Sequence, residues 1–102
     1  MSMNPVNVLI VDDDAAVRAI LQEVLLHEGY GVSLAEAGNA AIQVAKESVV
    51  HIVITDLQLP DIDGMEIIDR LAKQDAKIIP IMMTWFGTSE TAVRAMKSGA
   101  FE

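Results

Sequence analysis

The sequence predicts an α/β fold, a doubly wound parallel sheet with helices on both faces, formed by a single domain over residues 1–102. Short runs rich in β-branched residues alternate with amphipathic helical patterns, which is typical of parallel strands joined by crossover helices. A length of 102 residues leaves no room for a second core. With 52% hydrophobic and 22% charged residues, the chain can bury a core.

The first strand and the first helix are the most clearly marked elements. Residues 7–11 form an apolar run that predicts the first strand. Asp14 is placed to cap the helix that follows, and Gly29 can end that helix in the left-handed conformation. The predicted inward face of the helix consists of apolar residues three and four positions apart: Val17, Ile20, Leu21, Val24 and Leu25.

The rest of the chain repeats the same alternation. The expected elements are a strand at residues 30–35, a helix at 39–46, a strand at 51–55, a helix marked by Met65, Ile68 and Leu71, a strand at 77–83 and a helix at 89–97. The predicted order is therefore βαβαβαβα, and no fifth strand or fifth helix follows in this pattern.

Composition indicates which classes of partner the chain can bind and in which compartment it is expected. The 15 acidic and 7 basic residues leave a net charge of −8, which opposes direct binding to nucleic acid or to an anionic membrane. No apolar run approaches the roughly 18 residues of a membrane span, and the N-terminus lacks a basic leader. The absence of cysteine excludes disulfides and thiolate metal sites and fits a reducing compartment. We therefore expect a cytoplasmic chain whose own partners are cations or basic surfaces.

Acidic and hydroxyl residues gather where the predicted strands end. Asp12, Asp13 and Asp14 follow the first strand, Asp56 ends the third, and Thr84 ends the fourth. In open parallel sheets, ligands bind beyond the carboxyl ends of the strands. Carboxylates crowded in one partly dry pocket repel one another unless a cation is present, and ligation by oxygen alone suits Mg²⁺. With a hydroxyl donor nearby, the pattern favours phosphoryl chemistry.

Three segments, "VLIVDDD", "VITDLQLPDIDG" and "PIMMTWFGTSETAVRAMKSGAF", resemble the receiver domain of two-component response regulators. The resemblance covers nearly the whole chain. It implies the flavodoxin-like receiver fold with strand order 2-1-3-4, the fifth strand and last helix of the family being missing. It also implies that Asp56 accepts a phosphoryl group from the phosphohistidine of a sensor histidine kinase.

The same resemblance implies the other site residues. Asp13 and Asp56 are implied as direct Mg²⁺ ligands. Asp12 is implied as a ligand through water, and Gln58 as a ligand through its backbone carbonyl. Thr84 corresponds to the hydroxyl residue that swings toward the phosphoryl group. The family is implied to take part in its own phosphorylation and dephosphorylation, and we do not expect an enzyme acting on other substrates.

Two features depart from the family pattern. The position after the switch hydroxyl is usually small, but here it is Trp85, followed by Phe86. The family's lysine, which pairs with the acceptor and phosphoryl oxygens, ends a fifth strand, and Lys97 is no substitute because it lies in the predicted fourth helix. The segment "GTSETAVRAMKSGAF" most resembles receivers of enhancer-binding transcription activators. That resemblance implies an output domain beyond residue 102 and a role in transcription.

Two other functions stay open. A haloacid-dehalogenase-like phosphatase also uses a strand-end aspartate as nucleophile, but it needs a second aspartate two residues later, where this chain has Gln58. An interaction module with a receiver fold that is never phosphorylated stays open because the lysine is missing. Asp61 and Asp63 do not match the ligand spacing of a calcium loop, and we expect them to be solvated turn residues.

The fourth strand carries a further expectation. Without a fifth strand beside it, residues 77–83 form an edge strand whose backbone groups need partners. Pro80 removes one donor from that edge, but the flanking Ile and Met residues leave an apolar strip. We therefore expect the chain to self-associate.

Overall fold

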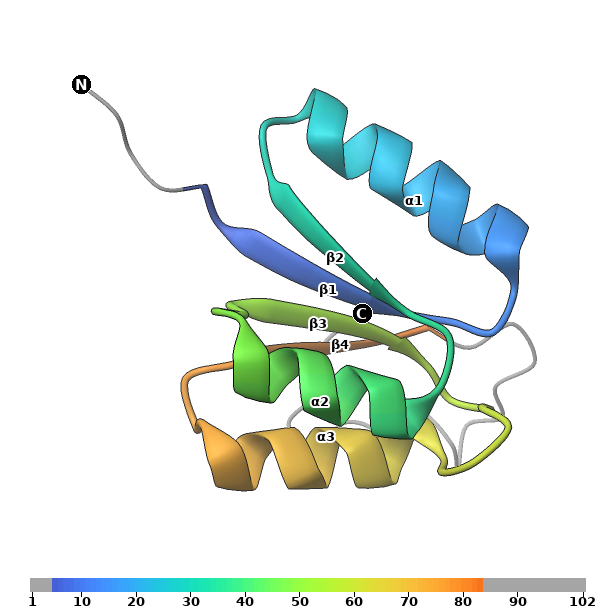
Figure 1. The fold of residues 1–102 in the computed structure, drawn as a ribbon, viewed down its shortest axis with the longest axis vertical. Coiled ribbons are helices and arrows are strands. Elements are labelled where there is room, and N and C mark those ends of the chain that lie inside the picture. The colour runs from blue at the N-terminus through green and yellow to red at the C-terminus, as the bar shows by residue number, and fades with distance from the viewer. Residues whose placement is uncertain (1–4, 84–102) are drawn as a thin grey trace.

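The computed structural model describes residues 5–83, in which four strands and three helices alternate. These elements are β1 (Asn7–Val11), α1 (Ala15–His27), β2 (Gly31–Ala35), α2 (Gly38–Glu47), β3 (Ile52–Asp56), α3 (Gly64–Gln74) and β4 (Ile79–Met83). The strands form one parallel sheet in the order β2-β1-β3-β4. Figure 1 shows α1 on one face of the sheet and α2 and α3 on the other. The predicted fold class and strand order are confirmed.

The element boundaries differ from the predicted ones by one or two residues. The largest difference is at β4, which begins at Ile79 and not at residue 77. Lys77 and Ile78 belong instead to a turn that begins at Asp75. The Asp75 carboxylate accepts a hydrogen bond from the Lys77 N–H at 2.9 Å. The predicted helix at residues 89–97 lies outside the described residues.

α1 begins and ends as the sequence predicts, but its predicted inward face is only partly correct. The Asp14 carboxylate caps the helix and accepts a hydrogen bond from the Ala16 N–H at 2.8 Å. Gly29 follows the helix in the left-handed conformation, with φ of 91°. No residue of α1 is buried, however, and Ile20 and Val24 are 62% and 54% exposed. The reason is that, among the elements within residues 5–83, α1 packs mainly on β1 and β2, on one side of the sheet.

The hydrophobic core lies between the sheet and the pair formed by α2 and α3. Its buried members are Leu9, Val11, Ala35, Ala41, Val50, Val53, Ile67 and Leu71. A second cluster joins Met65 and Ile68 of α3 to Met82 of β4. The predicted apolar face of α3 is thus confirmed. This helix packs on the part of the sheet that contains β3 and β4. No helix in the described part of the chain is long and apolar enough to cross a bilayer.

Candidate functional site

Three aspartates meet at the carboxyl ends of β1 and β3. The two strands are parallel neighbours, with Val11 paired to Thr55, so the residues that follow them lie side by side. One carboxylate oxygen from each of Asp12, Asp13 and Asp56 lies within 4.8 Å of the others. The sequence prediction that these carboxylates gather is therefore correct.

Asp12 is the buried member of this acidic cluster, with only 1% of its surface exposed. Its Oδ1 accepts a hydrogen bond from the Asp14 N–H at 2.8 Å, whereas its buried Oδ2 has no partner among the described residues. The backbone is held on both sides, because its N–H donates to the Ala35 carbonyl and its carbonyl accepts from Nη1 of Arg18 at 2.7 Å. Asp12 is therefore fixed between β2 and α1 with one carboxylate oxygen left unpaired.

Burial and the neighbouring carboxylates make the negatively charged form of Asp12 unfavourable. Burial raises the pKa of its carboxyl group above the ordinary value of 3.8. The hydrogen bond from the Asp14 N–H acts in the opposite direction, and the negative charges of Asp56, Asp13 and Asp14 raise the pKa further. A bound cation would relieve both the burial cost and the repulsion.

Asp56 occupies the last position of β3 and is half-buried. Its Oδ1 accepts a hydrogen bond from the Gln58 N–H at 3.2 Å, which places Gln58 directly beside the cluster. The start of α3 presses on the same backbone: the Gly64 N–H donates to the Leu57 carbonyl at 2.8 Å, and a Cβ atom at Gly64 would overlap the Asp56 carbonyl oxygen. Glycine at this position lets the helix approach the strand end closely.

Asp61 is exposed, as expected of a solvated turn residue, but its carboxylate also has backbone partners. Its two carboxylate oxygens accept hydrogen bonds from the Gly38 and Asn39 N–H groups, both at 2.8 Å. These groups open α2, whose own N-cap residue, Ala37, makes no side-chain hydrogen bond. The bonds from Asn39 and then Gly38 lower the pKa of the Asp61 carboxyl group. Asp61 therefore caps a helix that precedes it in the chain.

Asp63 is likewise exposed, and it is the N-cap of α3. Its carboxylate accepts a hydrogen bond from the Glu66 N–H at 2.9 Å. The sequence carried a signal for this role, since an N-cap residue followed three positions later by Glu is the pattern of a capping box. No comparable local signal marks Asp61, because its partners are 22 and 23 residues away.

The remaining predicted site residue, Thr84, lies outside the described residues.

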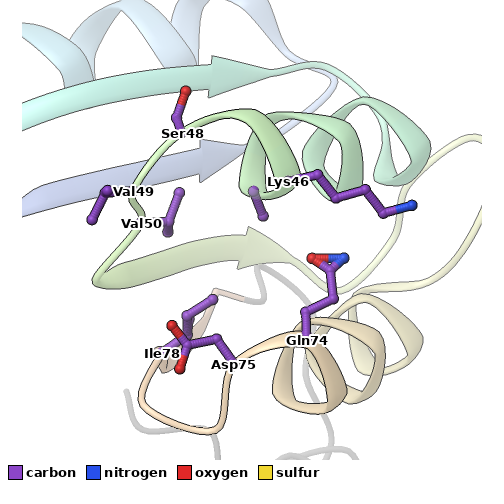
Figure 2. Close-up of a pocket in the computed structure, with 8 residues that line it drawn as sticks. Lys46, Ser48, Val49, Val50, Gln74, Asp75 and Ile78 are labelled. Atoms are coloured by element: carbon purple, nitrogen blue, oxygen red, sulfur yellow. The ribbon is translucent and has the colours of Figure 1, made fainter.

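A cavity of about 460 Å³ lies between the C-terminal ends of α2 and α3 (Figure 2). Val50 precedes β3 and Ile78 precedes β4, so this cavity is at the opposite end of the strands from the acidic cluster. The chemistry predicted for Asp56 therefore does not involve it.

The residues of the acidic cluster fit a divalent cation. Three carboxylates supply oxygen ligands, and the unpaired, buried Oδ2 of Asp12 leaves an acceptor facing no donor of the described chain. Ligation by oxygen atoms with water completing the shell is the preference of Mg²⁺.

A parallel sheet in this order, with its acidic cluster at the carboxyl ends of two neighbouring strands, defines a doubly wound α/β protein of the flavodoxin-like type. Residues 8–102 match the family model of the response regulator receiver domain. The chain belongs to this family.

Its relatives include regulators of transcription. The chain is 36% identical over 102 residues to the transcriptional regulatory protein ZraR of Klebsiella oxytoca. The match covers all of this chain and 23% of that protein. It thus spans about a quarter of the length of the curated relatives it matches. The predicted likeness to receivers of enhancer-binding transcription activators is confirmed.

Two solved structures show the same fold. The beryllofluoride-activated NtrC4 receiver domain dimer is 33% identical with a TM-score of 0.88, the match covering 94% of this chain and 79% of that one. The Ssk1 receiver domain of Saccharomyces cerevisiae, solved with the histidine phosphotransfer protein Ypd1, is 29% identical with a TM-score of 0.82. That match covers 99% of this chain and 79% of the other.

Proposed function

We propose that this receiver domain accepts a phosphoryl group on Asp56 from a sensor histidine kinase, with Mg²⁺ as cofactor, and thereby regulates an output domain. The observation that carries this proposal is the acidic cluster, in which Asp12, Asp13 and Asp56 approach within 4.8 Å and one buried oxygen has no partner within residues 5–83. Structural residues seldom crowd like charges in this way, because the repulsion costs stability.

Each residue has a separate role in the proposed reaction. A carboxylate oxygen of Asp56 forms the new O–P bond while the N–P bond of the phosphohistidine breaks and its electron pair leaves on the imidazole nitrogen. The strand end holds this oxygen in position for in-line attack. Asp12, Asp13 and the Gln58 carbonyl would hold Mg²⁺, which when bound neutralises charge on the phosphoryl oxygens. The Thr84 hydroxyl would then donate to the phosphoryl group.

The proposed partners follow from the relatives and from the charge. Because the matched relatives are transcriptional regulatory proteins of which this chain spans about a quarter, we place the output domain beyond residue 102. The Ssk1 receiver was solved with a histidine phosphotransfer protein, which supports a phosphohistidine donor. A net charge of −8 argues against direct nucleic-acid or membrane binding by this domain and suits a cytoplasmic role.

Phosphate incorporation tests the proposed function. With Mg²⁺ and a small phosphodonor such as acetyl phosphate, the chain is expected to gain one phosphate that hydroxylamine removes, as it does from an acyl phosphate, measured by intact mass. Asp56→Asn should abolish it, because the nucleophilic oxygen is lost. Asp69→Asn, an exposed aspartate of α3, is the matched control and should retain it. Phosphate retained in Asp56→Asn would refute the acceptor, and no phosphate in any variant would favour an interaction module.

We also propose that the chain self-associates through the outer edge of β4. Within residues 5–83 this strand pairs only with β3, and Ile79 is 49% exposed. The NtrC4 receiver was solved as a dimer, which supports association in this family. Sedimentation should show a mass that rises with concentration, and Ile79→Lys should reduce it because a charge blocks edge pairing. A strictly monomeric chain at all concentrations would contradict this.

A further inference from the structure

Asp61 joins the loop after Asp56 to the first turn of α2. The loop consists of residues 57–63 and connects β3 to α3. The Asp61 carboxylate accepts from two successive backbone N–H groups of α2, and its Oδ1 also accepts from the Ile62 N–H at 2.9 Å. Since Ala37 provides no cap of its own, the start of α2 depends on this loop residue.

A hydrophobic contact reinforces the same connection. Ile62 packs against the core cluster, and a Cβ atom at Gly38 would overlap its side chain. The two ends of the loop are also joined, because the Gly64 N–H, just after its last residue, donates to the carbonyl of Leu57, its first residue. The loop is thus held at its end by α3 and near its middle by α2, with Gln58 between Asp56 and the α2 contact.

We propose that Asp61 is a positioning residue, which anchors the loop to α2 and thereby holds Gln58 beside Asp56 for cation binding. This inference rests on the proposed function, because it takes the Gln58 carbonyl as a Mg²⁺ ligand. A loop that loses its anchor samples other conformations, and affinity falls with the fraction of molecules in the competent one. The coupling is reciprocal: Mg²⁺ at the acidic cluster should also stabilise the bonds that Gly38 and Asn39 donate.

Two substitutions of equal size and charge separate anchoring from simple electrostatics. In Asp61→Asn the amide nitrogen must face one of the two N–H groups, donor against donor, so the bidentate contact is lost. Asp63→Asn removes the same charge from the same loop, but its single bond from the Glu66 N–H needs only one oxygen, and Asn caps helices as well as Asp does. Both residues are exposed, so both variants should fold.

Calorimetric titration with Mg²⁺ at about 0.15 M ionic strength limits the effect of the lost charge. We expect the dissociation constant to rise about threefold to tenfold in Asp61→Asn, as for the loss of a helix cap, and to change about twofold or less in Asp63→Asn. Amide hydrogen exchange gives the second readout: Mg²⁺ should slow exchange at Gly38 and Asn39 in the unsubstituted chain and not in Asp61→Asn.

Equal affinities in the two variants, or exchange at Gly38 and Asn39 that ignores Mg²⁺, would overturn this inference and leave the proposed function intact. Absence of Mg²⁺ binding to the unsubstituted chain would instead overturn the proposed function, and the inference with it.

Discussion

Asp12→Asn is expected to stabilise the metal-free protein at neutral pH by about 1–3 kcal/mol, the usual cost of a buried polar group without a partner. The asparagine oxygen can still accept from the Asp14 N–H, and the amide group replaces the negatively charged Oδ2, which has no partner in the described part of the chain. It can donate toward the neighbouring carboxylates of Asp13 and Asp56. Thermal or urea unfolding in the presence of a chelator measures the change.

When Mg²⁺ is present, the unsubstituted chain should become more stable than Asp12→Asn. A ligand that binds only the folded state raises its stability, so Mg²⁺ should raise the melting temperature of the unsubstituted chain. The increment should shrink markedly in Asp12→Asn and also in Asp13→Ala. An undiminished increment in both variants would place the cation elsewhere.

Asp12→Asn should also alter the dependence of stability on pH. The pKa of Asp12 is raised in the folded state above 3.8, so the folded protein holds this proton more tightly than the unfolded chain. The contribution of Asp12 to stability is therefore full below pH 3.8 and is lost as pH rises through the folded pKa. In Asp12→Asn this loss should disappear. A pH profile unchanged by the substitution would contradict the burial cost assigned to Asp12.

Gly64→Ala is expected to destabilise the fold by about 1–3 kcal/mol, the usual cost of overpacking. The new Cβ atom would overlap the Asp56 carbonyl oxygen and come within 3.0 Å of the Leu57 Cα atom. Backbone atoms in a strand cannot rotate away as a side chain can, so either α3 or the strand end must shift. Urea unfolding measures the loss, and phosphate incorporation should fall because Asp56 is displaced.

Gly38→Ala provides a matched control. Gly38 and Gly64 are the first residues of α2 and α3, so the intrinsic effect of alanine on the helix is the same. The Cβ atom at Gly38 would overlap the Ile62 side chain and come within 3.1 Å of Ile67 Cδ1, but both are side-chain contacts, and side chains can shift more readily than backbone. We expect a smaller loss of stability than for Gly64→Ala. An equal or larger loss at Gly38 would show that the backbone contact at Gly64 is not the limiting one.

Sequence reasoning succeeded where a property depends on local pattern and on strand order. Hydrophobic periodicity predicted all four strands, and the adjacency of β1 and β3 then brought Asp12, Asp13 and Asp56 together. The Asp14 cap and the left-handed Gly29 were also correct, since each depends on residues within one turn. The assignment of roles to these side chains, and to Thr84, stays a prediction.

It failed where a side chain acts on a distant part of the chain. Asp61 is exposed as predicted, but its capping of α2 could not be predicted, because its partners lie 22 and 23 residues earlier and its local surroundings resemble any acidic turn. Periodicity likewise identified the apolar face of α1, but not how much of that face the sheet covers. Ile20 was therefore placed inward although it is 62% exposed. Both cases concern tertiary contacts, which a one-dimensional pattern does not encode.

The lack of buried residues in α1 has a consequence for how the protein opens. Local unfolding costs least where few apolar side chains leave contact with a core, and α1 has none buried whereas α3 has four, Met65, Ile67, Ile68 and Leu71. Within residues 5–83, we therefore expect α1 to detach at a lower free energy than α3 or the sheet. Because Asp14 caps α1 and directly follows Asp13, we expect detachment of α1 to loosen one side of the acidic cluster while Asp56, at the end of β3, stays in place.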